Sequence, residues 1–239
     1  MIKPLIIIPT YNEELNIVDL IYEINKVLYK VEFSILVVDD ASIDSTAQKV
    51  EQLKEKFKNI YLLKRKGKFG LASAYTDGFK KGIELGFNCF IQMDADFSHD
   101  PKYLPIMLEK LKDNDVVIAS RNIKGGKVEG WGLIRNLISK GGSIYSKIVL
   151  NCKINDLTGG FNAYRKEILD KINLDCIISQ GYCFQIEMKY KAYKLGARIN
   201  EFPIVFVDRK KGKSKMNKAI FFEAFINILK LRSYDDKKN

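Results

Sequence analysis

Two aspartates separated by one residue form the clearest chemical feature of the sequence. Asp94 and Asp96 follow Cys89–Met93, an apolar run with the length and composition of a buried strand. If the chain stays extended past this run, both carboxylates point to one side, with their Cα atoms about 6.6 Å apart. Such a pair can share one hard divalent cation, Mg²⁺ or Mn²⁺, and leave coordination positions open for a diphosphate. We therefore expect a metal site at Asp94 and Asp96, although two solvated aspartates in a turn are the alternative.

Polar clusters also follow two earlier apolar runs. Residues 9–13 read PTYNE, and residues 39–46 read DDASIDST. The carboxyl ends of parallel strands meet at one edge of a sheet, so all three clusters are expected to converge there. At that edge Tyr11 could stack on a base and Asp39 or Asp40 could hydrogen-bond a ribose, with a nucleoside diphosphate as the leaving group. An aromatic residue at such a position is as often part of the core.

Other kinds of catalytic site find little support in the composition. His99 is the only histidine, so a serine or cysteine triad would depend on that residue alone. The four cysteines lie far apart and form no C-x-x-C pair, which argues against a zinc cluster and against a dense disulfide framework. They are Cys89, Cys152, Cys176 and Cys183.

The elements that would position the polar clusters alternate along the first 120 residues. Short apolar runs predict strands at Leu5–Pro9, Phe33–Val38, Asn59–Leu63, Cys89–Met93 and Val116–Ala119. Apolar residues at helical spacing predict helices at Ile17–Leu28, Asp44–Phe57, Leu71–Leu85 and Lys102–Leu111. This alternation predicts an α/β fold with a single, doubly wound and mostly parallel sheet flanked by helices.

The second half of the chain is less regular. A mobile, glycine-rich basic loop is expected from residue 121, leading into a helix near Ile134. A strand, a helix and a strand are expected at Leu157–Tyr164, Tyr182–Leu195 and Arg198–Val207, followed by an apolar helix at Ala219–Leu231. No linker divides the chain, so residues 1–232 are expected to form one domain, with an amphipathic C-terminal helix near 217–231 and a charged tail at 233–239.

The positive charge is concentrated in two segments. The 239 residues carry a formal net charge of +11. Residues 121–153 hold seven basic residues and one acidic residue, and residues 209–239 hold ten basic and three acidic residues, so the rest of the chain sums to −2. Two basic segments on a nearly neutral body predict a local anion site rather than a nucleic-acid-binding coat. Solvated lysine-rich surfaces are the alternative.

The sequence predicts a protein that does not cross a membrane by itself. No uncharged apolar run approaches the ~20 residues that span a bilayer, and the N-terminus shows no signal-peptide layout. The Ala219–Leu231 helix would be about 20 Å long, which suffices to lie in the bilayer interface. Packing onto the body of the domain is the alternative. We expect a cytoplasmic protein that is peripherally associated with the cytoplasmic face of a membrane.

Seven short motifs stand out along the chain: PTYNE, DDASIDST, QMDADFSHDP, ASR, DLTGGF, GYCFQIEM and FVDRKKGKSKM. In this order and spacing they resemble the family-two glycosyltransferases of the dolichol-phosphate (polyprenol-phosphate) mannosyltransferase type, and the resemblance covers residues 4 to about 216. The first motif and the D-x-D pair occur in enzymes with many different donors. The last two motifs are more selective and indicate the mannosyltransferase subgroup.

The resemblance implies a GT-A type nucleotide-diphospho-sugar transferase fold and a metal-dependent, inverting reaction. Mannose would pass from GDP-mannose to a polyprenyl monophosphate at the membrane surface, with Mg²⁺ or Mn²⁺ as cofactor. A small membrane-anchor subunit is a further possible partner, and no nucleic acid is expected.

The resemblance also assigns roles to individual positions. The catalytic set is Asp96, Arg121 and Arg209, and the metal ligands are Asp94 and Asp96. The donor-binding set is Pro9, Tyr11, Glu13, Val38, Asp40, Asp94, Ala95, Asp96, Arg121, Arg209 and Lys215. The acceptor-side set is Arg135, Ser139, Thr158, Gly160, Gln185 and Glu187.

Three positions depart from the family pattern and leave the choice of sugar and acceptor open. Asn122 stands where the family often has tyrosine, Ala72 where it has glycine, and Asn162 where it has arginine. A family-two transferase that uses UDP-glucose or another nucleotide sugar, on a lipid phosphate or a surface glycan, is therefore an alternative. A basic membrane- or nucleic-acid-binding module without catalysis is a second one.

Overall fold

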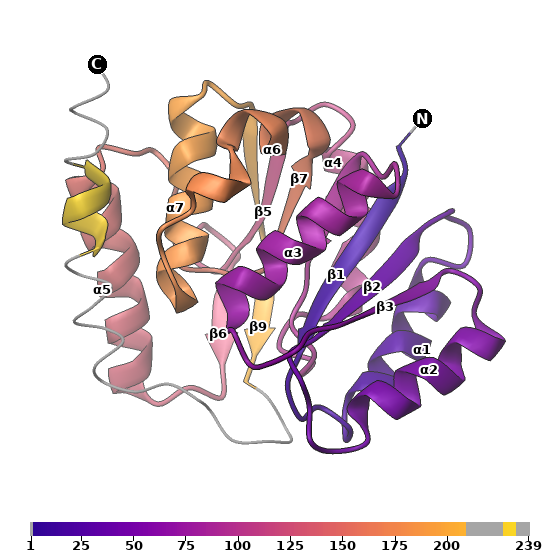
Figure 1. Ribbon diagram of the computed structural model, residues 1–239. Coiled ribbons are helices and arrows are strands. Elements are labelled where there is room, and N and C mark those ends of the chain that lie inside the picture. The colour runs from indigo at the N-terminus through magenta and orange to yellow at the C-terminus, as the bar shows by residue number, and fades with distance from the viewer. Residues whose placement is uncertain (1, 209–226, 233–239) are drawn as a thin grey trace.

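The computed structural model describes residues 2–208 and 227–232 and has one central sheet with helices on both faces (Figure 1). The sheet contains seven strands in the order β3-β2-β1-β4-β7-β5-β8, and β6 and β9 form a separate two-stranded ribbon. The predicted α/β fold with a mostly parallel sheet is therefore confirmed.

The first half of the chain builds the parallel part of the sheet. Its elements are β1 (Pro4–Thr10), α1 (Ile17–Val27), β2 (Ser34–Asp39), α2 (Thr46–Lys56), β3 (Ile60–Lys64), α3 (Leu71–Glu84) and β4 (Cys89–Gln92). β1 lies between β2 and β4, and Leu5 aligns with Ser34 on one side and with Phe90 on the other. These strands and helices agree with the predicted ones to within about two residues.

The second half adds strands of both directions. Its elements are η1 (Pro101–Tyr103), α4 (Leu104–Lys110), β5 (Val116–Ser120), β6 (Lys127–Glu129), α5 (Leu133–Val149), β7 (Asn162–Arg165), α6 (Lys166–Ile172), η2 (Leu174–Cys176), α7 (Gly181–Lys194), β8 (Ile199–Pro203) and β9 (Val205–Val207). β7 is antiparallel to both β4 and β5, whereas β8 is parallel to β5.

Several predictions for this half were wrong in detail. The strand expected at Leu157–Tyr164 begins only at Asn162, because residues 156–159 form a turn in which the Gly159 amide donates to the Asp156 carboxylate. The strand expected at Arg198–Val207 is divided at Ile204, so that its two parts pair with β5 and with β6. The expected loop carries β6, and α6 was not predicted.

The strands alternate their side chains between two hydrophobic cores. Leu5 and Ile7 of β1 face the core beneath α3, α6 and α7, whereas Ile6 and Ile8 face the core beneath α1, α2 and α4. Because both faces are covered, β1, β2 and β4 are apolar along most of their length, which is the pattern that made them recognisable in the sequence.

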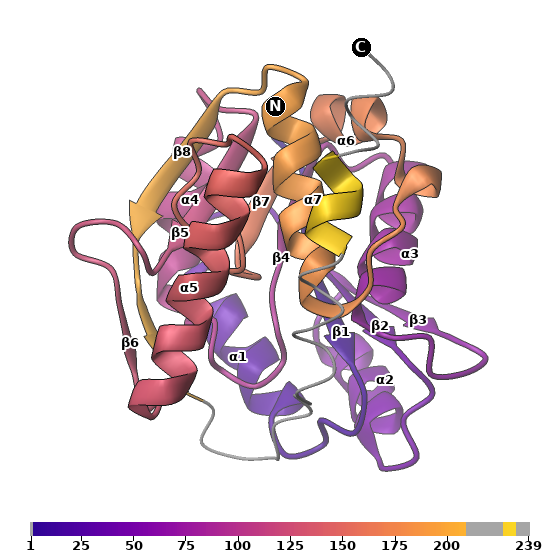
Figure 2. The same cartoon turned by 90° about the vertical axis from the view of Figure 1, so that its left-hand side faces the viewer.

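The described part of the C-terminal helix packs onto the body of the protein. Residues 227–232 are helical, and Ile228 and Leu231 belong to the core beneath α7. Figure 2 shows this segment in yellow, on the side of the molecule that carries α5 and α7. For this part of the helix, packing is the correct alternative; the rest of the predicted helix lies outside the described residues. No helix in the described ranges is long and apolar enough to cross a membrane.

Candidate active site

Three strained loops follow β1, β2 and β4 at one edge of the sheet. Asn12, Ala41 and Phe97 have φ angles of 57°, 58° and 62°, a left-handed conformation that residues other than glycine rarely adopt. The first two loops are joined directly, because the Asn12 amide donates to Ser42 Oγ at 2.9 Å and the Ile43 amide donates to Asn12 Oδ1 at 3.0 Å. Strain of this kind is often concentrated at functional sites.

Asp94 is oriented by two buried side chains. The Tyr75 hydroxyl donates to Asp94 Oδ1 at 3.1 Å. The Asp94 backbone amide donates to His99 Nδ1 at 3.0 Å, so the neutral ring carries its proton on Nε2, which lies 3.8 Å from Asp94 Oδ2. Burial lowers the pKa of His99, although Asp94 and Asp96 oppose this effect. His99 therefore acts as a neutral support beside Asp94.

The two aspartates of the D-x-D pair differ in their exposure. The Asp94 side chain is 37% exposed, whereas Asp96 is buried and accepts a hydrogen bond from the Ser98 amide at 3.1 Å. In the described ranges no three His, Cys, Asp or Glu side chains gather as a set of metal ligands. The pair nevertheless fits Mg²⁺ or Mn²⁺, because these ions accept one or two carboxylates and take their other oxygens from water and substrate phosphates.

The aspartates that follow β2 hold the loops of this edge. Asp40 is buried and accepts from Arg65 Nη1 at 2.7 Å and from the amides of Phe69 and Gly70 at 3.0 and 2.8 Å. Asp39 accepts from the Thr10 hydroxyl at 3.0 Å. Both carboxylates thus fix the edge that would receive a nucleotide.

A lysine that the sequence did not single out reaches the same edge. Lys68, in the loop between β3 and α3, places its Nζ 3.9 Å from the centre of the Tyr11 ring. A cation over an aromatic face is attracted by the electrons of the ring. The exposed mouth of this edge therefore has an aromatic surface and a positive charge.

Arg121, at the end of β5, makes a buried ion pair with Asp156. Its Nε and Nη2 donate to the two carboxylate oxygens at 2.8 and 2.7 Å, and its backbone amide donates to Oδ2 at 2.8 Å. Nη2 also donates to the Thr158 hydroxyl at 2.9 Å. Burial alone would raise the pKa of Asp156, but the charge and hydrogen bonds of Arg121 lower it to about 2. The pair is therefore fully ionised at neutral pH.

A fully buried lysine supports this pair from below. Lys189 of α7 donates from Nζ to the carbonyl oxygens of Asp156 and Gly159 at 2.7 and 2.6 Å, and more weakly to that of Leu157. Burial lowers the pKa of Lys189 to about 7, against the attraction of Asp156. Lys189 therefore ties α7 to the turn that carries Asp156 and Thr158.

A family model described as glycosyl transferase family 2 matches residues 5–173. The chain belongs to this family. Over 227 residues it is 42% identical to an undecaprenyl-phosphate mannosyltransferase of Micrococcus luteus, covering 95% of this chain and 92% of that protein. Over 228 residues it is 37% identical to a polyprenol monophosphomannose synthase of Mycolicibacterium smegmatis, covering 95% and 85%. The resemblance found in the sequence is thereby confirmed, and the protein is a glycosyltransferase.

The fold of this family-two glycosyltransferase also resembles that of solved enzymes. A glucosyl-3-phosphoglycerate synthase from Mycobacterium tuberculosis, crystallised with Mn²⁺, UDP and glucosyl-3-phosphoglycerate, aligns with a TM-score of 0.71 at 16% identity, covering 97% of this chain and 80% of that one. A second structure of that enzyme, with phosphoglyceric acid, gives a TM-score of 0.72 at 15% identity, with the same coverage. The expected GT-A type fold is confirmed.

The residues that the motif resemblance assigns to the donor lie where the strands end. Pro9 aligns with Val38 in the ladder between β1 and β2, and Val38 and Ala95 are buried in the two cores. Tyr11 and Glu13 lie in the loop after β1, and Glu13 accepts from the Asn16 side chain at 3.0 Å. Arg209 and Lys215 lie outside the described residues.

The residues that the motif resemblance assigns to the acceptor gather in part around Arg121. Two arginines approach the Trp131 ring, with the guanidinium carbons of Arg135 and Arg121 4.2 and 5.8 Å from its centre. Arg135 also pairs with Asp208 at 3.0 Å, and Ser139 is half-buried on the same helix.

Three further acceptor-side positions have mainly internal contacts. Gly160 packs against His99, since a Cβ at this position would lie 3.3 Å from His99 Cε1. Gln185 Oε1 accepts from Asn162 at 3.0 Å. Glu187 is fully buried and accepts from the Ser179 amide at 2.8 Å. Glu187 therefore fixes the segment before α7.

Proposed function

We propose that the protein transfers mannose from GDP-mannose to a polyprenyl monophosphate, with inversion at the anomeric carbon, at a membrane surface. The observation that carries this proposal is the D-x-D pair after β4, next to the Arg121–Asp156 pair, in a chain that is 42% identical to an undecaprenyl-phosphate mannosyltransferase. GDP-mannose as the donor comes from the motif resemblance.

Asp94 and Asp96 would hold the divalent cation. When bound, the cation neutralises the charge that develops on the departing diphosphate. Tyr75 supports this role because its hydroxyl orients the Asp94 carboxylate before any ligand arrives, and His99 supports it because it holds the backbone amide of Asp94. The Mn²⁺ and UDP bound by the glucosyl-3-phosphoglycerate synthase support the use of a divalent cation by this fold.

The reaction needs no separate general base. An oxygen of the acceptor phosphate forms the new bond to C1 of mannose, and the bond from C1 to the diphosphate oxygen breaks, so GDP leaves with the electron pair. A phosphate monoester has its second pKa near 6 and is already anionic at neutral pH. The buried, neutral His99 is suited to supporting Asp94 rather than to removing a proton.

The chain's own task is then to hold two anions close together. Arg121 and Arg135, which both approach the Trp131 ring, supply positive charge for the acceptor phosphate. The Asp156 carboxylate keeps Arg121 in one orientation, so little conformational entropy is lost when an anion binds. Arg209 and Lys215 belong to this proposal through the family motif alone.

Membrane contact is supported by the outer face of α5. Leu137, Ile144 and Ile148 are 70%, 59% and 72% exposed, and their spacing of seven and four residues places them on one side of the helix. An acceptor with a polyprenyl tail must be met at a bilayer surface, which we propose to be the cytoplasmic one. A small membrane-anchor subunit remains a possible partner.

One experiment tests the function. The protein is incubated with radiolabelled GDP-mannose or UDP-glucose and a polyprenyl phosphate, with Mg²⁺, Mn²⁺ or a chelator, and the lipid phase is extracted. We expect label in the lipid from GDP-mannose alone, and none with the chelator. Lipid-phase label from UDP-glucose instead would favour the alternative donor. No label from any donor, with salt-sensitive binding to vesicles, would favour a non-catalytic module.

A further inference from the structure

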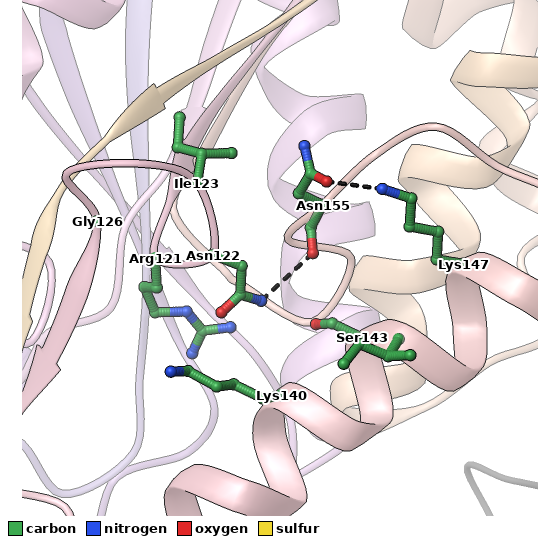
Figure 3. Close-up of a pocket in the computed structure, with 9 residues that line it drawn as sticks. Arg121, Asn122, Ile123, Gly126, Lys140, Ser143, Lys147 and Asn155 are labelled. Atoms are coloured by element: carbon green, nitrogen blue, oxygen red, sulfur yellow. Dashed lines mark hydrogen bonds between the residues drawn. The ribbon is translucent and has the colours of Figure 1, made fainter.

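A basic pocket lies beside Arg121, between the loop after β5 and α5. It has a volume of about 320 Å³ and is formed by the loop after β5, the middle of α5 and the segment before β7 (Figure 3). Its lining residues are Arg121, Asn122, Ile123, Gly126, Lys140, Ser143, Ile144, Lys147 and Asn155.

The charge in this pocket is positive and only partly balanced. Three cationic residues line the pocket and no carboxylate does. Asp156 balances Arg121, but the described residues pair neither Lys140 nor Lys147 with a carboxylate. Lys147 donates instead to the neutral Asn155 Oδ1 at 2.7 Å. In the part of the chain that the structure describes, neither lysine is therefore neutralised by a direct ion pair.

The position of Lys140 strengthens this argument. Figure 3 shows its side chain pointing from α5 toward the side chain of Arg121. Asp156 offsets the charge of Arg121 on its buried side, and an anion bound between Arg121 and Lys140 would be attracted by both cations. Glu201 is not a lining residue: its carboxylate accepts from the Asn155 side chain at 2.8 Å and from Ser120 at 2.9 Å, so it is linked to Lys147 only through Asn155.

The rim of the pocket is apolar and continues onto an exposed surface. Ile144 lines the pocket and is 59% exposed, and it belongs to the same face of α5 as Leu137 and Ile148. A ligand that matches both features carries a phosphate next to a hydrocarbon chain. Anionic phospholipids have this chemistry, with about 1 kcal/mol gained for each well-placed basic residue.

We propose that this pocket binds the phosphate headgroup of an anionic phospholipid and thereby orients α5 on the bilayer. The membrane setting rests on the proposed function. The pocket shares Arg121 with the proposed acceptor site but differs from it in its other cations, because Arg135 and Lys140 are five residues apart and lie about 140° apart around α5. The acceptor is the other source of a lipid phosphate, and the test separates the two.

The test compares two double variants that remove the same charge from the full-length protein. Lys140→Gln/Lys147→Gln removes the lysines of the pocket. Lys30→Gln/Lys58→Gln removes two exposed lysines near the ends of α1 and α2, and serves as the control. Binding is measured by co-sedimentation with phosphatidylcholine vesicles that contain or lack phosphatidylglycerol. We expect the pocket variant to bind the anionic vesicles about tenfold to thirtyfold more weakly than the wild type, and the control less than threefold.

Two further measurements keep the outcome unambiguous. Lys140→Arg/Lys147→Arg should retain vesicle binding, since it keeps both charges. This variant also keeps the proposal testable if the Gln variant does not fold. In neutral detergent, the KM for polyprenyl phosphate should be the same in the Gln variant and the wild type. A raised KM together with vesicle binding like that of the control would assign the pocket to the acceptor. Equal losses of vesicle binding in both double variants would show only an effect of net charge. Either result overturns the proposal. Lysine-dependent vesicle binding by a protein without transferase activity would instead refute the proposed function and keep the pocket.

Discussion

Arg121 and Asp156 form a two-point ion pair between segments that lie 35 residues apart in the chain. The Arg121 side chain is 7% exposed and that of Asp156 is fully buried. A pair so enclosed has lost its hydration, and each charge depends on the other for compensation. The pair therefore links the end of β5 to the turn before β7 and defines one wall of the candidate site.

Replacing Arg121 by methionine should destabilise the fold strongly. The substitution keeps much of the side-chain volume but removes the guanidinium that pairs with the buried Asp156 carboxylate, and breaking a buried ion pair in this way costs about 3–5 kcal/mol. Urea denaturation of the wild type and of Arg121→Met measures the difference. The double variant Arg121→Met/Asp156→Leu should recover a large part of the loss. A single variant within about 1 kcal/mol of the wild type would contradict the assignment of a buried pair.

The same pair predicts how stability depends on pH. The pKa of Asp156 is about 2 in the folded protein, against an ordinary value of 3.8, so the unfolded chain binds more protons between these values. The lowered pKa of Asp156 contributes about 2 kcal/mol to the free energy of unfolding. This contribution is present above the unfolded value of 3.8 and is lost as the pH falls toward 2. Unfolding free energies from pH 5 to pH 2 should fall more steeply for the wild type than for Asp156→Asn. Equal slopes would argue against the shift.

The strands of the first half could be predicted because their environment is simple. Runs such as Leu5–Pro9 are buried on both faces, so their composition alone identifies them. β7 is different, because Asn162 and Arg165 within it are polar and its start is fixed by a turn. That turn depends on the contact of Asp156 with Arg121, which no local pattern of residues reveals.

The candidate site was predictable to a similar extent. The sequence located Asp94 and Asp96 because they follow a buried strand directly. It could not indicate that Tyr75 orients Asp94, since this side chain comes from α3, nor that the loop folds back so that His99 accepts from the Asp94 amide. Lys189 was missed for the same reason. A lysine in a helix is normally solvated, and only the packing of α7 against the Asp156 turn shows that this one is buried.

Lys189→Met should weaken the turn beneath Arg121. It leaves the carbonyl groups of Asp156 and Gly159 without their buried donor, and each unsatisfied group costs about 1–3 kcal/mol. We expect a lower unfolding free energy and a higher KM for polyprenyl phosphate, with a smaller change in the KM for the donor. Lys194→Met, at the exposed end of the same helix, is the matched control. Equal donor and acceptor effects would indicate a general loss of structure.

Two glycine substitutions should have opposite effects on stability. In Gly78→Ala the new Cβ would lie 2.6 Å from Ile7 Cγ2, so α3 would have to move away from β1, at a cost of about 1–3 kcal/mol. In Gly141→Ala on α5 nothing lies within 4 Å of the new Cβ, and alanine should stabilise the helix by about 0.5–1 kcal/mol. Thermal unfolding of both variants checks this. A stabilised Gly78→Ala would contradict the close packing of α3 on β1.

Asp96→Ala should leave the fold intact and reduce the formation of lipid-linked sugar by orders of magnitude. Asp96 accepts a hydrogen bond from the Ser98 amide, and the loss of one such bond should cost about 1 kcal/mol of stability. The same substitution removes one of the two hard ligands of the cation, and the diphosphate would lose most of the charge compensation that its departure requires. Asp113→Ala, at an exposed aspartate after α4, is the control and should retain wild-type turnover.

The activities of these variants are compared over a range of Mg²⁺ and Mn²⁺ concentrations, because a weakened site should need more metal. If Asp96→Ala turned over like the wild type at every metal concentration while still requiring metal, the cation would have to be held elsewhere.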